Sequence, residues 1–112
     1  MINWQQARQL QQDVGKDEMA EVVELFISEV DEAIETLRNN YSTMAASEKS
    51  AAFHFLKGCA LNLGFNTFGA QCGLGEEITQ SGKEPDFGIT DFLDVYARSK
   101  QQFAQEYKNE LG

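Results

Sequence analysis

An apolar stripe with the period of an α-helix runs through residues 17–39, and it constrains the fold more than any other feature of the chain. Its members recur at three- and four-residue intervals, and they are Met19, Val22, Val23, Phe26, Val30, Ala33 and Leu37. Residues at this spacing share one face of a helix. Acidic side chains cover much of the remaining surface, so the segment predicts a long amphipathic helix with Asp17 as its N-cap.

Helical patterns occupy the rest of the chain as well. Asn3 and Gln6 resemble a capping box for a short helix over 4–12, which Gly15 would end. Further helices are predicted over 48–63, 66–81 and 91–110, with Ser47 and Thr90 as N-caps of the first and last. The inner stripe of the last helix is formed by Phe92, Val95, Tyr96, Ser99, Phe103 and Tyr107.

These helices predict a single all-α domain over residues 1–112. No segment alternates at period two over more than a few residues, so strands are not expected. The connections between the long helices are short, with the clearest loop at 82–88, and short connections favour antiparallel neighbours. The expected architecture is therefore an antiparallel up-down-up-down four-helix bundle with a short N-terminal helix laid across one end.

Composition excludes several classes of partner. The net charge is −9, which disfavours binding to nucleic acid or to an anionic membrane surface. No apolar run is long enough to span a membrane, and the N-terminus lacks the pattern of a secretory signal, so we expect a cytoplasmic protein. Cys59 and Cys72 are expected as buried free thiols. With a single histidine they match no zinc pattern, so no metal or cofactor is expected.

That single histidine, His54, is the strongest candidate for chemistry. Positions three and four residues apart share a helix face, so Lys57 and Gly58 should lie beside its ring. A helical wheel places the core stripe on Ala52, Leu56, Cys59 and Leu63, with Phe53, Phe55 and Ala60 on its flanks. His54 points away from this stripe. Its expected outward neighbours are Ser47, Ser50, Ala51, Lys57, Gly58 and Leu61.

An exposed imidazole in this setting suits phosphoryl transfer. The ring is neutral and nucleophilic near pH 7. Lys57 would offset the charge of a phosphate on the ring. Gly58 costs about 1 kcal/mol relative to alanine in the middle of a helix, which indicates that the backbone must be approached closely there. His54 is thus predicted to accept a phosphoryl group from another protein.

The residues around His54 resemble the histidine-containing phosphotransfer (HPt) domains of multistep phosphorelays. The family pattern is His-x-Leu-Lys-Gly, then a small residue and, later, a second glycine. His54, Leu56, Lys57, Gly58 and Gly64 match it. The resemblance extends over the whole chain in length and helix order.

The next helix matches the family less closely. Cys72 and Glu76 fit positions where the family often has a cysteine and then a Gln or Glu near the histidine. Cys59 replaces the usual serine or alanine, and Gly75 replaces a large apolar residue. Gly73 and Gly75 each weaken a helix by about 1 kcal/mol by propensity, which puts the straightness of this helix in doubt.

The resemblance implies that His54 accepts a phosphoryl group from the aspartate of a receiver domain and passes it to another receiver. Such receivers belong to response regulators or hybrid histidine kinases, and they supply the magnesium ion. The chain has no glycine-rich phosphate loop, so neither an ATP site nor autokinase activity is expected. We expect a monomer that acts as a phosphotransfer intermediate rather than as an enzyme.

Roles follow for the neighbouring residues. Lys57 is interpreted as the neutralising cation, and Gly58 as the point of partner access. Glu76 is a candidate to accept a hydrogen bond from one ring nitrogen of His54 and so fix its tautomer. Leu61 and Leu10 are expected to contribute to the docking surface around the histidine.

Three alternatives stay open. A histidine-kinase dimerisation module would normally have an acidic residue directly after the histidine and a proline soon after, whereas this chain has Phe55 and no proline in that helix. A helical bundle could instead dock a receiver or another protein without phosphotransfer, although that would not require His54 and Lys57. A Cys-His catalytic pair is disfavoured because Cys59 is predicted to point inward.

Overall fold

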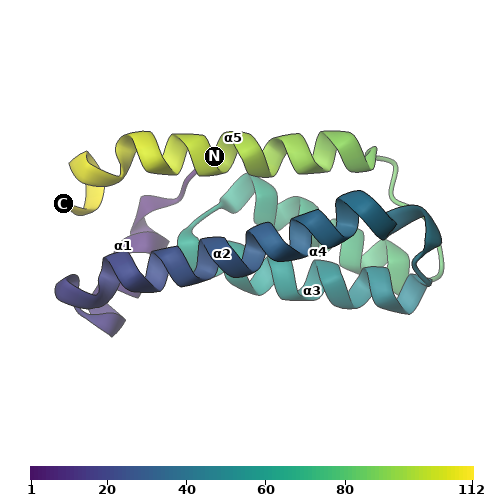
Figure 1. Ribbon diagram of the computed structural model, residues 1–112, viewed down its shortest axis with the longest axis horizontal. Helices are drawn as coiled ribbons and strands as arrows, with labels where there is room; N and C mark the ends of the chain where they lie inside the picture. Colours follow the sequence, from purple (N-terminus) through teal and green to yellow (C-terminus); the bar gives the residue numbers. More distant parts are fainter.

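The helical periods of the sequence correspond to five α-helices in a computed structural model that describes residues 1–112. They are α1 (Trp4–Val14), α2 (Lys16–Asn40), α3 (Ala46–Leu63), α4 (Asn66–Gln80) and α5 (Ile89–Leu111), with a short 3-10 turn, η1 (Tyr41–Thr43), after α2. The four long helices run antiparallel to their sequence neighbours, and α1 lies at one end (Figure 1). The predicted all-α bundle with a short N-terminal helix is confirmed.

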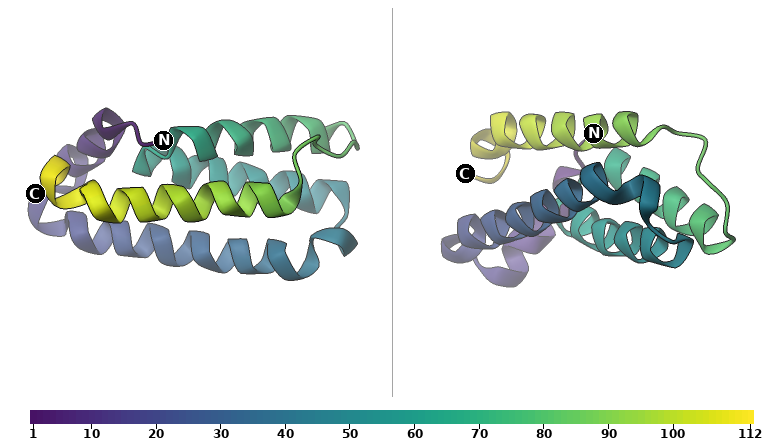
Figure 2. Two further views of the ribbon diagram at one scale, coloured as in Figure 1. Left: turned by 90° about the horizontal axis from the view of Figure 1, so that it is seen from above. Right: turned by 45° about the vertical axis from the view of Figure 1, so that its right-hand side comes forward.

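Helix α1 begins and ends with the signals that the sequence contains. The side-chain oxygen of Asn3 accepts hydrogen bonds from the backbone N–H groups of Gln5 and Gln6. The helix continues to Val14, two residues beyond the predicted end, and stops at Gly15, whose φ is 93°. Trp4 stacks on Phe103 of α5 with ring centroids 4.9 Å apart, which fixes α1 against the bundle. In Figure 2, α1 lies at the end of the bundle where α5 ends.

The predicted N-caps of three helices are wrong by a small and regular amount. Asp17, Ser47 and Thr90 are each the second residue of their helix rather than the residue before it. At α3 the cap comes from inside the helix, because the Glu48 carboxylate accepts the backbone N–H of Ala45 at 2.8 Å. Asp17 then lies in the first turn of α2, where its charge complements the helix dipole.

Aromatic rings from α3, α4, α5 and the α3–α4 connection form the centre of the core. The largest fully buried rings are Phe53, Phe65, Phe68 and Phe92. In α2 the predicted stripe is buried deepest at Met19, Val30 and Leu37, and the structure adds Ile34 to it. In α5 the predicted stripe is buried except for Tyr107, which is half-buried. Phe55, predicted on the flank of the core, is instead 43% exposed.

The connection between α3 and α4 is tight and is held by the N-terminal segment. Gly64 ends α3 in the left-handed conformation with φ 82°. Its carbonyl accepts the N–H of Asn3 at 2.6 Å, and Met1 accepts the N–H of Asn66 at 3.1 Å. A Cβ at position 64 would also clash with the Asn3 carbonyl, so glycine is required here for space as well as for φ. This anchoring places α3 and α4 side by side (Figure 2).

No helix combines the length and the apolar character that a membrane crossing would need.

Candidate functional site

His54 lies on the outer face of α3, as the helical wheel predicted. Its side chain is 70% exposed, whereas Leu56, Cys59 and Leu63 of the same helix are buried. The ring therefore projects from the bundle near the middle of a helix whose opposite face is locked into the core. Burial of Cys59 on that opposite face also removes it as a partner for His54.

Glu76 of α4 connects the two predicted active residues of α3. One carboxylate oxygen, Oε2, lies 2.7 Å from Nδ1 of His54, and the other, Oε1, lies 2.6 Å from Nζ of Lys57. The Glu76 side chain is only 14% exposed although its partners lie at the surface. The structure thus brings together His54, Lys57 and Glu76, which come from two helices and three separate sequence positions.

Lys57 and His54 determine the protonation state of the Glu76 carboxylate. The hydrogen bond from Lys57 lowers the pKa of Glu76 most, and the bond to His54 lowers it further, against an opposing effect of desolvation. Glu76 is therefore ionised near neutral pH. An ionised carboxylate can only accept hydrogen bonds, so the proton on the neutral ring sits on Nδ1. The lone pair of Nε2 is then available on the exposed side of the ring.

Lys57 is held along its length rather than free in solvent. Its aliphatic stem passes over Gly73 of α4, where an added Cβ would lie 3.5 Å from Cδ of the lysine. Its ammonium is bonded to Glu76 and the side chain is 35% exposed. An ammonium has three N–H donors, so the bond to Glu76 leaves donors for a further acceptor beside the ring.

The surface next to His54 is open. Nothing lies within 4 Å of the position that a Cβ would take at Gly58. On the other side of the ring a broad open hollow of about 740 Å³ is lined mainly by small residues of α3 and by α4, including Ala51, Glu76 and Thr79. Ser50 does not belong to the outer surface as predicted, because α4 covers it and its hydroxyl donates to the Glu76 carbonyl at 3.4 Å.

The two leucines predicted for a docking surface have different positions. Leu61 is 49% exposed on α3, one turn beyond Gly58 and Lys57, and so is accessible to a partner. Leu10 of α1 is only 8% exposed and belongs to the core, so that part of the prediction is wrong. The reason is that α1 packs its apolar face onto the bundle rather than presenting it beside the histidine.

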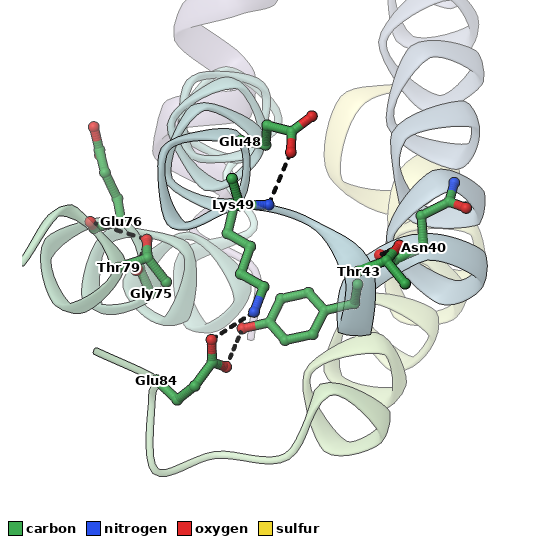
Figure 3. Close-up of polar contacts among 10 residues, drawn as sticks. Asn40, Thr43, Glu48, Lys49, Gly75, Glu76, Thr79 and Glu84 are labelled. Atoms are coloured by element: carbon green, nitrogen blue, oxygen red, sulfur yellow. Dashed lines mark hydrogen bonds and ion pairs between the residues drawn. The ribbon is translucent and has the colours of Figure 1, made fainter. Parts of the chain in front are cut away.

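Lys49, the other lysine of α3, lies in the first turn of the helix and belongs to a separate cluster of polar contacts. Its Nζ lies 2.6 Å from Glu84, and the hydroxyl of Tyr41 donates to the same carboxylate at 2.9 Å (Figure 3). The bond from Lys49 lowers the pKa of Glu84 most, with Tyr41 adding to the effect. This cluster ties the loop before α5 to the start of α3, and it leaves Lys57 as the cation beside His54.

Neither cysteine offers chemistry at the site. Cys59 and Cys72 are buried free thiols, as predicted, and burial raises the pKa of both. Thiols of raised pKa are poor nucleophiles and poor metal ligands. No three His, Cys, Asp or Glu side chains gather in a way that could hold a metal ion.

A family model described as "Hpt domain" matches residues 21–106, from the second turn of α2 to the last turns of α5. The match includes His54, Lys57, Gly58 and Glu76 and leaves α1 outside. No curated protein and no solved structure gives a significant match.

Proposed function

This chain belongs to the Hpt domain family, and on that premise we propose that His54 receives a phosphoryl group from one receiver domain and hands it to another. The family indicates histidine phosphotransfer in phosphorelays, and its members are phosphotransfer intermediates that interact with receiver domains. The observation that carries the proposal for this chain is the contact of Glu76 with Nδ1, because it leaves Nε2 as the exposed nucleophile.

In the proposed step, Nε2 of His54 attacks the phosphorus of an aspartyl phosphate on the receiver. A P–N bond forms as the P–O bond to the aspartate breaks, and the aspartate leaves as a carboxylate. Nδ1 keeps its proton, so the ring becomes positively charged and the Glu76 carboxylate lies 2.7 Å from that charge. The reverse reaction with a second receiver transfers the group onward.

Lys57 and Gly58 contribute through charge and space. The Lys57 ammonium lies one helical turn from His54 and can turn an N–H toward the phosphoryl oxygens while it stays bonded to Glu76. Phosphoryl transfer depends mainly on positioning and on neutralising charge rather than on covalent chemistry by the protein. The open space at Gly58 lets the loops of a receiver approach the ring. The receivers are those of response regulators or hybrid histidine kinases, and these receivers supply the magnesium ion used in the transfer.

The test is incubation of this chain with a phosphorylated receiver, followed by chemical analysis of any phosphate transferred. Phosphohistidine is labile in acid and stable in base, so we expect label with that behaviour on the wild type and none on His54→Gln. Binding of the receiver without uptake of phosphate would overturn the proposal and favour a docking module without phosphotransfer.

A further inference from the structure

The residues that precede His54 and Glu76 meet each other across the α3–α4 interface. A Cβ added at Gly75 would lie 2.9 Å from two carbons of the Phe53 ring and 3.0 Å from a third. Real Cβ atoms do not approach that closely, so the ring occupies the place of the missing side chain. The backbone of α4 therefore rests on the face of Phe53, immediately beside the pair formed by His54 and Glu76.

The Phe53 ring has no room to give way. It is fully buried, and it packs edge-on against Phe92 at 5.2 Å, Phe87 at 6.1 Å and Tyr41 at 6.4 Å between ring centroids. Close-packed interiors respond to added volume by shifts of backbone or by strained side chains. A side chain at position 75 would thus displace α4 rather than the ring.

Hydroxyl groups satisfy two carbonyls of this stretch of α4. Within α4, the hydroxyl of Thr79, which is fully buried, donates to the Gly75 carbonyl at 2.7 Å (Figure 3). Across the interface, the hydroxyl of Ser50 in α3 donates to the carbonyl of Glu76 at 3.4 Å, so this second bond is the one that ties the α4 backbone to α3. The two carbonyls belong to Gly75 and Glu76, and the backbone position of these residues determines whether the Glu76 carboxylate can contact His54 and Lys57.

We propose that Gly75 is a positioning residue that sets the reach of Glu76 to His54 and Lys57. The absence of a side chain lets α4 lie against Phe53, and the next residue then spans both partners with one carboxylate, at 2.7 and 2.6 Å. Glycine is a poorer helix former than alanine, so the close approach of α4 to Phe53 compensates for a local loss of helix stability. The consequence for phosphotransfer rests on the proposed function, whereas the geometric statement does not.

The experiment compares Gly75→Leu and Gly75→Ala with Gly69→Ala. Gly69 is in the same helix, and its added Cβ would meet only the Cβ of Ala60, at 3.4 Å, which is an ordinary contact. The control therefore gains the same helix propensity without pushing on Phe53. Circular dichroism verifies that each variant is folded. The primary readout is NMR of the His54 ring nitrogens, which reports the tautomer, together with titration of the Glu76 carboxyl.

We expect wild type and Gly69→Ala to keep the proton on Nδ1 and a lowered pKa at Glu76. Gly75→Leu should mix the two tautomers and return the pKa of Glu76 toward its ordinary value, and Gly75→Ala should do so in part. If Gly75→Leu does not fold, Gly75→Ala alone decides. Unchanged tautomer and titration in the folded Gly75 variants would overturn the proposal.

A compensating variant separates positioning from a general loss of packing. Phe53→Ala combined with Gly75→Leu exchanges the large and small partners, and we expect it to restore the Nδ1 tautomer relative to Gly75→Leu alone. If the double variant folds but Glu76 remains displaced, crowding between position 75 and the Phe53 ring is not what displaces Glu76.

Phosphorylation by a small phosphoramidate donor provides the functional arm. A displacement of about 1 Å can cost a factor on the order of 100 in rate, so we expect Gly75→Leu to be slower than Gly69→Ala by at least about tenfold. Wild-type protein that takes up no phosphate from a phosphorylated receiver, with the tautomer still responding to position 75, would refute the proposed function and leave the positioning role intact.

Discussion

Nζ of Lys57 lies 2.6 Å from Oε1 of Glu76, so the cation beside His54 is already paired with a carboxylate of the neighbouring helix. The pair spans two helices and is partly shielded, since the Glu76 side chain is only 14% exposed. Lys57 therefore orients the carboxylate that orients the histidine, in addition to any direct contact with a phosphoryl group.

We expect Lys57→Ala to slow phosphotransfer and to shorten the lifetime of the phosphohistidine more than it lowers stability. A partly exposed ion pair contributes little to folding, whereas a phosphate carries a charge of about −2 near neutral pH. Transfer rates and thermal midpoints measured side by side test this. Lys57→Arg should recover part of the rate, because charge survives but the planar guanidinium reaches its acceptors differently. Normal transfer by a Lys57→Ala protein that melts much lower would assign the lysine a structural role only.

His54→Gln should abolish phosphate uptake and leave the fold intact. The side chain is 70% exposed and its one side-chain hydrogen bond is to Glu76, so we expect a change of no more than about 0.5 kcal/mol in the free energy of unfolding. Denaturant titration and phosphate uptake from a labelled receiver are the measurements. Uptake at the wild-type rate would place the acceptor elsewhere on the chain.

Gly58→Gln should separate stability from access. Glutamine is a better helix former than glycine by up to about 1 kcal/mol, and the space around position 58 is empty, so the thermal midpoint should hold or rise. Transfer from a receiver should slow because the partner is obstructed. Phosphorylation by a small phosphoramidate serves as the control, since it needs no docking and should be unaffected. Equal transfer from the receiver in both proteins would contradict the role in access.

Gly64→Ala, in contrast to Gly58→Gln, should lower the stability of the fold. Its φ of 82° is unfavourable for alanine, and the new Cβ would clash with the Asn3 carbonyl. We expect a loss of stability of more than about 1 kcal/mol. The measurement is the denaturation midpoint, and a wild-type midpoint would show that the N-terminal segment yields without cost.

Glu76→Gln should reveal a dependence of stability on pH. The bond from Lys57, and then that from His54, keep the pKa of Glu76 below its ordinary value. A carboxyl whose pKa is lowered on folding stabilises fully above its unfolded pKa, about 4.3, and this stabilisation is lost as pH falls through the lower folded value. Glu76→Gln should thus melt below wild type at pH 7, and the difference should close as the pH falls below about 4. A difference that does not vary with pH would show that charge at Glu76 is unimportant.

Local patterns in the sequence predicted the helices and the face of α3 on which His54 lies, because both depend on the helical period. They failed at the helix starts and at Leu10, where contacts between elements decide. The N-cap of α3 is displaced from Ser47 because the Glu48 carboxylate caps from within. The burial of Leu10 depends on how α1 packs on the bundle.

The contacts of Glu76 with His54 and Lys57 show more clearly that local sequence patterns do not predict contacts between helices. Resemblance to a family suggested its face, but its distances to His54 and Lys57 depend on how closely α3 and α4 approach. From the sequence, Gly75 was predicted to weaken its helix, because helix propensity considers one helix at a time. The contact with Phe53 explains why glycine stands at this position, and no local pattern in the sequence links these two residues.

The loop at residues 82–88 has the composition of a mobile segment, yet its side chains are tied into the rest of the bundle. Glu84 bonds to Lys49 and Tyr41, and Phe87 packs against Phe53 and stacks on Phe92 of α5. Opening the loop would require these contacts to break together, so it should not fray independently of α3. In hydrogen exchange, the amides of this loop that are hydrogen-bonded should therefore open with the cooperative unit that contains His54 rather than at the rate of a surface loop.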